Sequence, residues 1–200
     1  MVLARALVGE EKVFCQTLGT VVMFWNHIEA SFRTLLQYAA RGDGPPNIGD
    51  RIDVLIANLG NVSMAEAMEA ISEDFDPPTS GHLKHCAELF DALRLYRNYY
   101  VHAAISFATT VDEQQTVAIM QQVTAKGGSL KLHQGSVKRS ELETFENRLS
   151  EFHTYVTAIL IALIGVPDVQ PFSSLGKPPL PDKLELRRLR LIEHRRQLRS

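Results

Sequence analysis

The chain lacks most of the features that would assign a sequence to a class quickly. It contains only two cysteines, Cys15 and Cys86, far apart in the sequence, so we expect no disulfide framework. This usage favours a reducing, cytoplasmic compartment. The longest apolar run, residues 155–166, is about half the length of a membrane-spanning helix, so we expect no membrane segment. The N-terminal apolar run is short and broken, and it is followed by acidic residues, which does not fit a secretion signal.

Net charge is also small. The 200 residues carry a formal charge of -2, which gives no overall field toward nucleic acid. The charge is uneven, however, because residues 177–200 hold eight Lys/Arg and three Asp/Glu, a balance of +5. The remaining residues therefore carry -7. This basic segment has three alternative roles, which are contact with RNA phosphates, docking on the acidic body or a partner, and solvation.

Apolar residues are plentiful, at 45% of the chain, and they recur with helical spacing. This period predicts helices over about 10–40, 50–74 (broken at Gly60-Asn61), 79–104 and 140–164. Two Ser-x-x-Glu patterns predict capping boxes, at Ser63–Glu66 and at Ser140–Glu143. Between the last two helices, short β-branched runs predict an antiparallel insertion of two or three strands.

The predicted fold is mainly α, a four- to five-helix bundle with a small antiparallel β insertion before the last core helix. We expect the helical domain to span 1–165, with the insertion at about 104–135. A Pro-rich linker at 166–183 and a basic tail or helix at 184–200 complete the expected organisation.

The stretch "LYRNYYVH" (95–102) places polar groups on a predicted core helix. The buried stripe of this helix leads by steps of three and four to Arg97, where an apolar residue is expected. Because arginine is rarely fully buried without a partner, Arg97 pairs with a carboxylate or lines a polar crevice. Glu29 of the first helix is the predicted partner.

Ideal helix geometry separates Arg97 from His102. Five residues correspond to about 140° around the axis, so the two side chains are not expected to share a tight site on one straight helix. They converge if the helix deforms, or if two copies of it meet across a dimer axis. Asn98 and His102, four residues apart, lie on one face.

Arg97-Asn98-x-x-x-His102, near the end of a late bundle helix, resembles the motif of the HEPN superfamily. The segment "FWNHIEASFRTLL" (24–36) resembles the long early helix of that fold, and the likeness covers roughly residues 10–165. The β insertion and the basic tail lie outside the common pattern. The resemblance implies a HEPN-like helical bundle that forms a homodimer with the two motif helices facing each other.

The resemblance also implies a function. Many such proteins are metal-independent endoribonucleases of toxin–antitoxin, defence or RNA-processing systems, and an antitoxin is then a further partner. Others bind nucleotides or partners without catalysis. Arg97 and His102 would be the catalytic pair, supported by Asn98, and RNA cleavage by its own 2′-hydroxyl needs the proton transfer and positive charge that they offer. No metal or cofactor is implied.

Plainer interpretations of the same residues remain open. Arg97 pairs with a carboxylate in one of them, and His102 serves the negative end of a helix. Tyr96 and Tyr100 either stack on bases or belong to the core. His82 and Cys86, four apart, have a spacing that zinc allows, but no second pair accompanies them, and solvated histidines are the expected alternative.

Overall fold

The computed structural model describes residues 9–41, 46–109, 116–126, 129–165, 174–182 and 187–189. The helices among them are α1 (Glu10–Arg41), α2 (Pro46–Ala57), α3 (Asn61–Ser72), α4 (Pro77–His102) and α5 (Arg139–Ile164). The strands are β1 (Ala104–Thr109), β2 (Thr116–Lys126), β3 (Ser129–Val137) and β4 (Arg187–Leu189). The mainly helical class and the β insertion before the last helix are thus confirmed.

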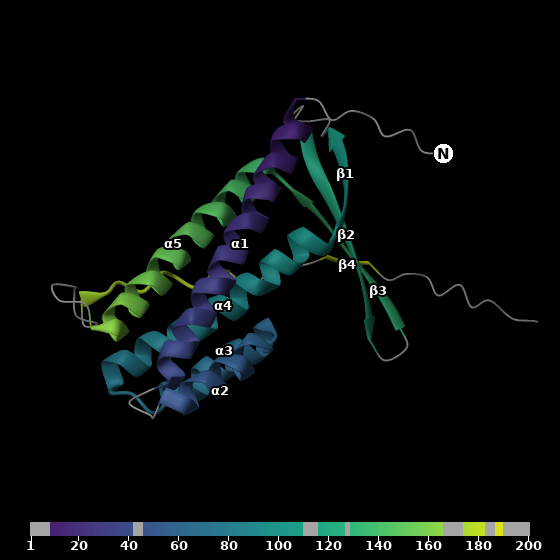
Figure 1. Ribbon diagram of the computed structural model, residues 1–200. Helices are drawn as coiled ribbons and strands as arrows, with labels where there is room; N and C mark the ends of the chain where they lie inside the picture. The colour runs from purple at the N-terminus through teal and green to yellow at the C-terminus, as the bar shows by residue number, and fades with distance from the viewer. Residues whose placement is uncertain are drawn as a thin grey trace, which may run out of the picture.

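Two long helices form the spine of the bundle. In Figure 1, α1 and α5 lie side by side, α4 crosses them, and the short helices α2 and α3 pack at the far end of α1. The sheet lies at the other end, beside the start of α1 and the end of α4 (Figure 1). The C-terminus of α4 is therefore the point at which the bundle meets the sheet.

The core is built from the apolar stripes that the helical period predicts. Phe90 of α4 stacks between Trp25 and Phe32 of α1, with ring centroids 5.2 and 4.1 Å apart. The remaining fully buried large side chains are supplied by α1, α3, α4 and α5; they include Ile28, Leu35, Leu36, Met64, Met68, Leu83, Leu93 and Phe152. Burial of one such side chain contributes about 1.5–3 kcal/mol, so these stripes fix how the helices pack.

Both predicted capping boxes are wrong. The helix α3 begins at Asn61, before Ser63, and Gly60 caps it without a side-chain hydrogen bond. The helix α5 begins at Arg139, one residue before the predicted Ser140, and the carboxylate of Glu141 accepts from the backbone N–H of Lys138 at 2.6 Å. At these two helices the N-cap residue lies three and two positions before the predicted serine.

Two other helix ends follow ordinary rules. Asp76 caps α4, since its carboxylate accepts from the backbone N–H of Thr79 at 3.4 Å. Gly165 ends α5 in the left-handed conformation, with φ of 72°, where glycine meets no steric penalty. The start of α4 and the end of α5 are thus set by residues next to them in the sequence.

The sheet is antiparallel throughout, in the order β1-β2-β3-β4. β1 pairs with β2 over its whole length, and β2 pairs with β3 from Ala118↔Val137 to Lys126↔Ser129. Val117, Ala118 and Met120 of β2 are buried, and Phe107 of β1 meets Phe14 of α1 edge-on at 5.7 Å. The sheet is thereby packed onto the start of α1.

The C-terminal stretch returns to the body of the protein. Residues 174–182 run along α4, and residues 187–189 form β4, whose Leu189 pairs with Leu132 of β3. The prediction of a basic helix or tail is therefore wrong for 187–189, which form a strand, while residues 190–200 lie outside the described residues. Leucine alternating with arginine is compatible with a strand as well as with a helix.

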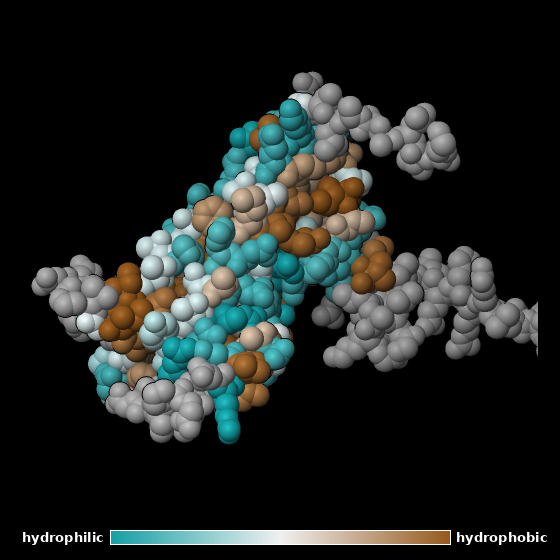
Figure 2. Space-filling view, in the orientation of Figure 1, coloured by the Kyte–Doolittle hydropathy of each residue, from teal (hydrophilic) through white to brown (hydrophobic). Residues whose placement is uncertain are grey.

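Hydrophilic side chains cover most of the face shown in Figure 2. Hydrophobic atoms gather beside the sheet and over α2 and α3 in that view (Figure 2). Among the exposed large apolar residues, Val54 and Leu55 belong to α2, Val62 belongs to α3 and Leu95 to α4.

Candidate functional site

The helix α4 carries the candidate site where its buried stripe reaches the surface. Leu83, Cys86, Phe90 and Leu93 of the predicted stripe are all buried. Arg97, at the next step, is only partly buried. Arg97 therefore interrupts the apolar stripe near the C-terminal end of α4, beside the sheet.

Arg97 and His102 meet within one chain. The Nη1 of Arg97 lies 3.0 Å from the Nε2 of His102 and donates to the Oδ1 of Asn98 at 3.1 Å. The expectation that one helix keeps the two side chains apart is therefore wrong. That expectation considered only the direction in which each residue leaves the axis, whereas the long arginine side chain reaches around the helix to its last residue.

The contact with Arg97 determines which ring nitrogen of His102 carries the proton. A guanidinium has only donors, so the Nε2 of His102 accepts and carries no proton in this arrangement. The proton of the neutral ring is then on Nδ1. Asn98 orients the guanidinium rather than the imidazole, since its oxygen accepts from Arg97. His102 is itself exposed, so its ring is open to an incoming group.

Arg97 has no carboxylate partner among the described residues, although its Nε is buried and forms no hydrogen bond there. The interpretation of Arg97 as half of an ordinary ion pair is therefore not supported in the described part of the chain. Within the described part of the chain, its positive charge meets only neutral acceptors. Such a charge is available to an anion that reaches the end of α4.

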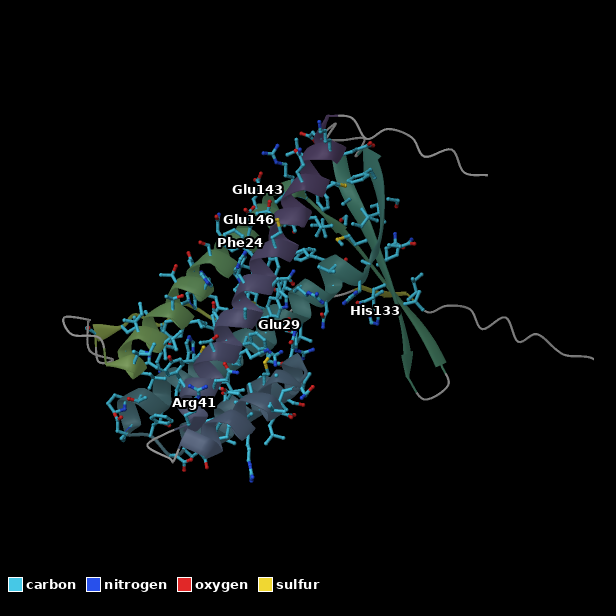
Figure 3. The ribbon with its side chains drawn as sticks, viewed as in Figure 1. Phe24, Glu29, Arg41, His133, Glu143 and Glu146 are labelled. Carbon is cyan, nitrogen blue, oxygen red and sulfur yellow. The ribbon has the colours of Figure 1, made fainter. Side chains whose placement is uncertain are left out.

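Glu29 does not contact Arg97, contrary to the prediction. Its carboxylate lies 3.5 Å from the Nη2 of Arg33, one turn along α1, and accepts from the Nδ2 of Asn61 at 3.3 Å. Arg33 also donates to the carbonyl oxygens of Ile56 and Leu59. Figure 3 shows Glu29 within the helical bundle, away from the sheet that carries His133. Glu29 therefore joins α1 to α2 and α3 instead of supporting the motif.

Tyr96 and Tyr100 belong to the packing between α4 and α5. Their rings lie 5.7 and 5.1 Å from the ring of Phe145, and Tyr100 is buried. Burial raises the pKa of the Tyr100 hydroxyl far above its ordinary value, and nearby Glu141 raises this pKa further. Tyr100 is thus a core residue, and a base cannot stack on it without displacing Phe145.

Tyr96 is partly exposed, but its hydroxyl is also engaged. It donates to the backbone carbonyl of Asp182 at 2.5 Å. Burial raises the pKa of Tyr96 above its ordinary value, partly countered by Arg148. The residue therefore ties the C-terminal stretch to the turn that precedes Arg97, a contact that no pattern in the sequence signals.

Tyr99 is the third tyrosine of the stretch, and it joins α4 to the sheet. A Cβ atom on Gly135 of β3 would lie 2.5 Å from the hydroxyl oxygen of Tyr99, so only glycine fits there without a shift. β1 begins at Ala104, two residues after the end of α4, so the sheet follows the motif directly in the sequence. No pattern in the sequence indicates this close approach, because it depends on strand register.

The two histidines at the start of α4 have partners other than a metal. The Nδ1 of His82 lies 2.8 Å from the hydroxyl of Tyr155, and His82 is buried, so the expectation of a solvated residue is wrong. The Nε2 of His85 donates to the carbonyl of Pro178 at 2.7 Å. Burial raises the pKa of the Cys86 thiol, which disfavours the thiolate that zinc binds. Among the described residues, no cluster of three or more potential metal ligands is found.

Two clefts open on the described surface. One, of about 250 Å³, lies between α4 and α5 and includes Tyr96, Phe145 and Arg148. The other, of about 620 Å³, lies between α3 and α4. Neither of these two clefts is lined by Arg97, Asn98 or His102.

Comparison with known proteins adds no assignment. No protein-family model, no curated protein and no solved structure matches the chain. Within the described residues, none of the helices has the length and apolar character needed to cross a membrane.

Proposed function

We propose that the protein is a HEPN-like, metal-independent endoribonuclease that acts as a homodimer. The observation that carries the proposal is the contact between Arg97 and His102, with Asn98 holding the guanidinium, at the end of α4. The three residues are those of the Arg-Asn-x-x-x-His pattern, and the mainly helical fold is compatible with the resemblance.

The chemistry follows from the groups present. A phosphate that enters beside His102 competes with its Nε2 for the donors of Arg97, because a charged oxygen is the stronger acceptor. Movement of the guanidinium onto the phosphate frees Nε2. The imidazole then accepts the proton of the 2′-hydroxyl as that oxygen attacks phosphorus, while Arg97 stabilises the charge that develops.

A second proton transfer requires a donor to the leaving oxygen. Among the described residues, His102 is the one imidazole that contacts Arg97, and neither of the two clefts above is lined by the motif. A second copy that presents its own His102 in the protonated, imidazolium form would supply that proton to the leaving oxygen and enclose the phosphate. The proposal therefore includes a homodimer with the two α4 ends facing each other.

The proposal is tested by incubating the purified protein with mixed cellular RNA in EDTA. We expect Arg97→Ala and His102→Ala each to lose activity by about 10²–10⁴-fold, the range for loss of general acid–base help or of transition-state charge stabilisation. Matched controls are Arg51→Ala and His27→Ala, which remove an exposed residue of each type from other helices. Sedimentation is needed to show that all variants have equal dimer content.

Cleavage that survives in both motif variants would assign the activity to another site and contradict the proposal. A strictly monomeric native protein that cleaves RNA would contradict the shared site alone. A toxin–antitoxin or defence role, with an antitoxin partner, remains part of the proposal, and a neighbouring gene that encodes a neutralising protein would support it.

The alternative is a HEPN-like module that binds a nucleotide or a partner without catalysis. It is favoured by the fact that Arg97 already occupies the lone pair of His102 that a base needs. Both side chains would then serve only as donors to a bound phosphate. A dimer that binds nucleotide with loss of binding in Arg97→Ala, yet leaves RNA intact, would support this alternative.

A further inference from the structure

The larger cleft, which we call the α3–α4 groove, is mainly apolar. Its lining includes Ala65 and Ala87, which are buried, and three exposed apolar side chains, Val62, Leu95 and Leu180. Each of these three is 46–48% exposed, so the groove presents apolar surface that nothing in the described chain covers. Apolar side chains gathered in a groove with a polar rim are typical of a docking site for a peptide segment.

The rim of the α3–α4 groove is acidic. Glu66 and Glu69 line it from α3, and Glu88 and Asp91 line it from α4. Arg94 neutralises one of these charges, because its Nε and Nη2 donate to Asp91 at 2.9 and 2.6 Å. The carboxylates of Glu66 and Glu69 have no ion-pair partner among the described residues, so the groove has a net negative charge.

We propose that the α3–α4 groove binds residues 190–200 of the same chain. This segment, "RLIEHRRQLRS", contains four arginines and one glutamate, so it has a net positive charge that complements the rim. It also contains Leu191, Ile192 and Leu198, which suit the apolar lining. Apolar contact supplies the affinity, while the opposite charges set which surface is chosen.

Continuity of the chain supports this occupant. Leu180 and Pro181, from the stretch that precedes β4, already line the groove. Pro181 to Leu189 is eight steps along the chain, so Leu189 lies at most about 28 Å from this edge of the groove. The eleven residues 190–200 extend to about 38 Å, so the segment is long enough to return. The docking holds four arginines on the acidic body, away from the end of α4, and it does not depend on the proposed nuclease function.

The test is amide hydrogen exchange of residues 190–200 in the full chain, followed by mass spectrometry. In the native protein at low salt we expect exchange at least about tenfold slower than in the variant Glu66→Lys with Glu69→Lys. The matched control, Asp74→Lys with Glu151→Lys, changes the net charge equally at exposed positions that do not line the groove. It should leave exchange of the segment as slow as in the native chain.

The decisive experiment swaps the charges of the segment and of the groove. Arg195→Glu with Arg196→Glu should release the segment, and combining it with Glu66→Lys and Glu69→Lys should restore slow exchange. Fast exchange in the native chain, or equal exchange in the groove and control variants, would overturn the proposal. Protection that rises with protein concentration would assign the groove to the segment of a second copy, which would also overturn docking within one chain.

Discussion

The guanidinium of Arg97 and the imidazole of His102 meet at 3.0 Å on the same helix, although they are five positions apart in the sequence. The contact joins the second-to-last turn of α4 to its final residue, next to the start of the sheet. Asn98 accepts from the same Nη1 atom at 3.1 Å, so both N–H groups of that nitrogen are used. The three polar residues of the stretch therefore form one unit before any ligand arrives.

The first prediction concerns the tautomer of His102. Because Arg97 can only donate, the neutral ring must keep its proton on Nδ1. Nitrogen NMR of the native protein near pH 8 should show Nε2 of His102 as the unprotonated nitrogen, and Arg97→Ala should weaken this preference. His27, an exposed histidine of α1, provides the reference within the same spectrum. A native His102 protonated on Nε2 would contradict the contact.

The second prediction concerns the approach of Tyr99 to β3. Gly135→Ala should destabilise the protein by about 1–3 kcal/mol, because the new methyl group would lie 2.5 Å from the tyrosine hydroxyl. In Tyr99→Phe the nearest ring carbon would be 3.6 Å away, which is ordinary contact, so Gly135→Ala should cost much less in that background. Urea unfolding of the two single variants and the double variant measures this coupling.

Gly19 is the control for that experiment. It lies within α1, and nothing is within 4 Å of the position a Cβ would take. Gly19→Ala should therefore stabilise the protein by about 0.5–1 kcal/mol through helix propensity. Equal effects of alanine at the two glycines would show that the close approach to Tyr99 is absent.

Much of the fold can be predicted from the spacing of apolar residues along the sequence. The apolar stripes of α1 and α5 contain most of the buried residues of those helices, because a helix must bury its apolar face. In α4 the stripe contains only part of them, since residues such as His82, Leu89 and Tyr99 are buried as well. The β insertion also follows, since short β-branched runs differ in period from the flanking helices. The third pairing of the sheet, between β3 and β4, does not follow, because it joins segments far apart in the sequence.

The site was predicted only in part. The motif residues were found because arginine interrupted an apolar stripe, but their contacts were not. Glu29 was assigned to Arg97, yet Arg33 at i+4 is its nearest cation and forms the ion pair. Tyr100 was a candidate for base stacking, but it lies against Phe145. Side-chain reach and helix-to-helix packing decide these contacts, and local spacing does not encode them.

The third prediction concerns the C-terminal stretch on α4. Tyr96→Phe removes the hydrogen bond to the carbonyl of Asp182, so residues 174–182 should exchange their amide hydrogens faster. The loss of one such bond costs about 0.5–1.5 kcal/mol. Tyr38→Phe is the control, since that hydroxyl belongs to an exposed residue of α1. No change in exchange of 174–182 in Tyr96→Phe would show that the other contacts alone hold the stretch.

The last prediction concerns alkaline pH. Burial raises the pKa of Tyr96, Tyr99, Tyr100 and Tyr155, and of the Cys86 thiol, above their ordinary values in the folded chain. The folded state therefore holds protons that the unfolded state releases, so stability is complete below the unfolded values and falls as pH rises through them. The urea midpoint should stay constant near pH 8 and decrease from about pH 9–10 upward, where unfolded cysteine and tyrosine ionise. Tyr100→Phe, which removes one buried hydroxyl, should make the decrease shallower, and a midpoint that rises with pH across this window would contradict the burial of these groups.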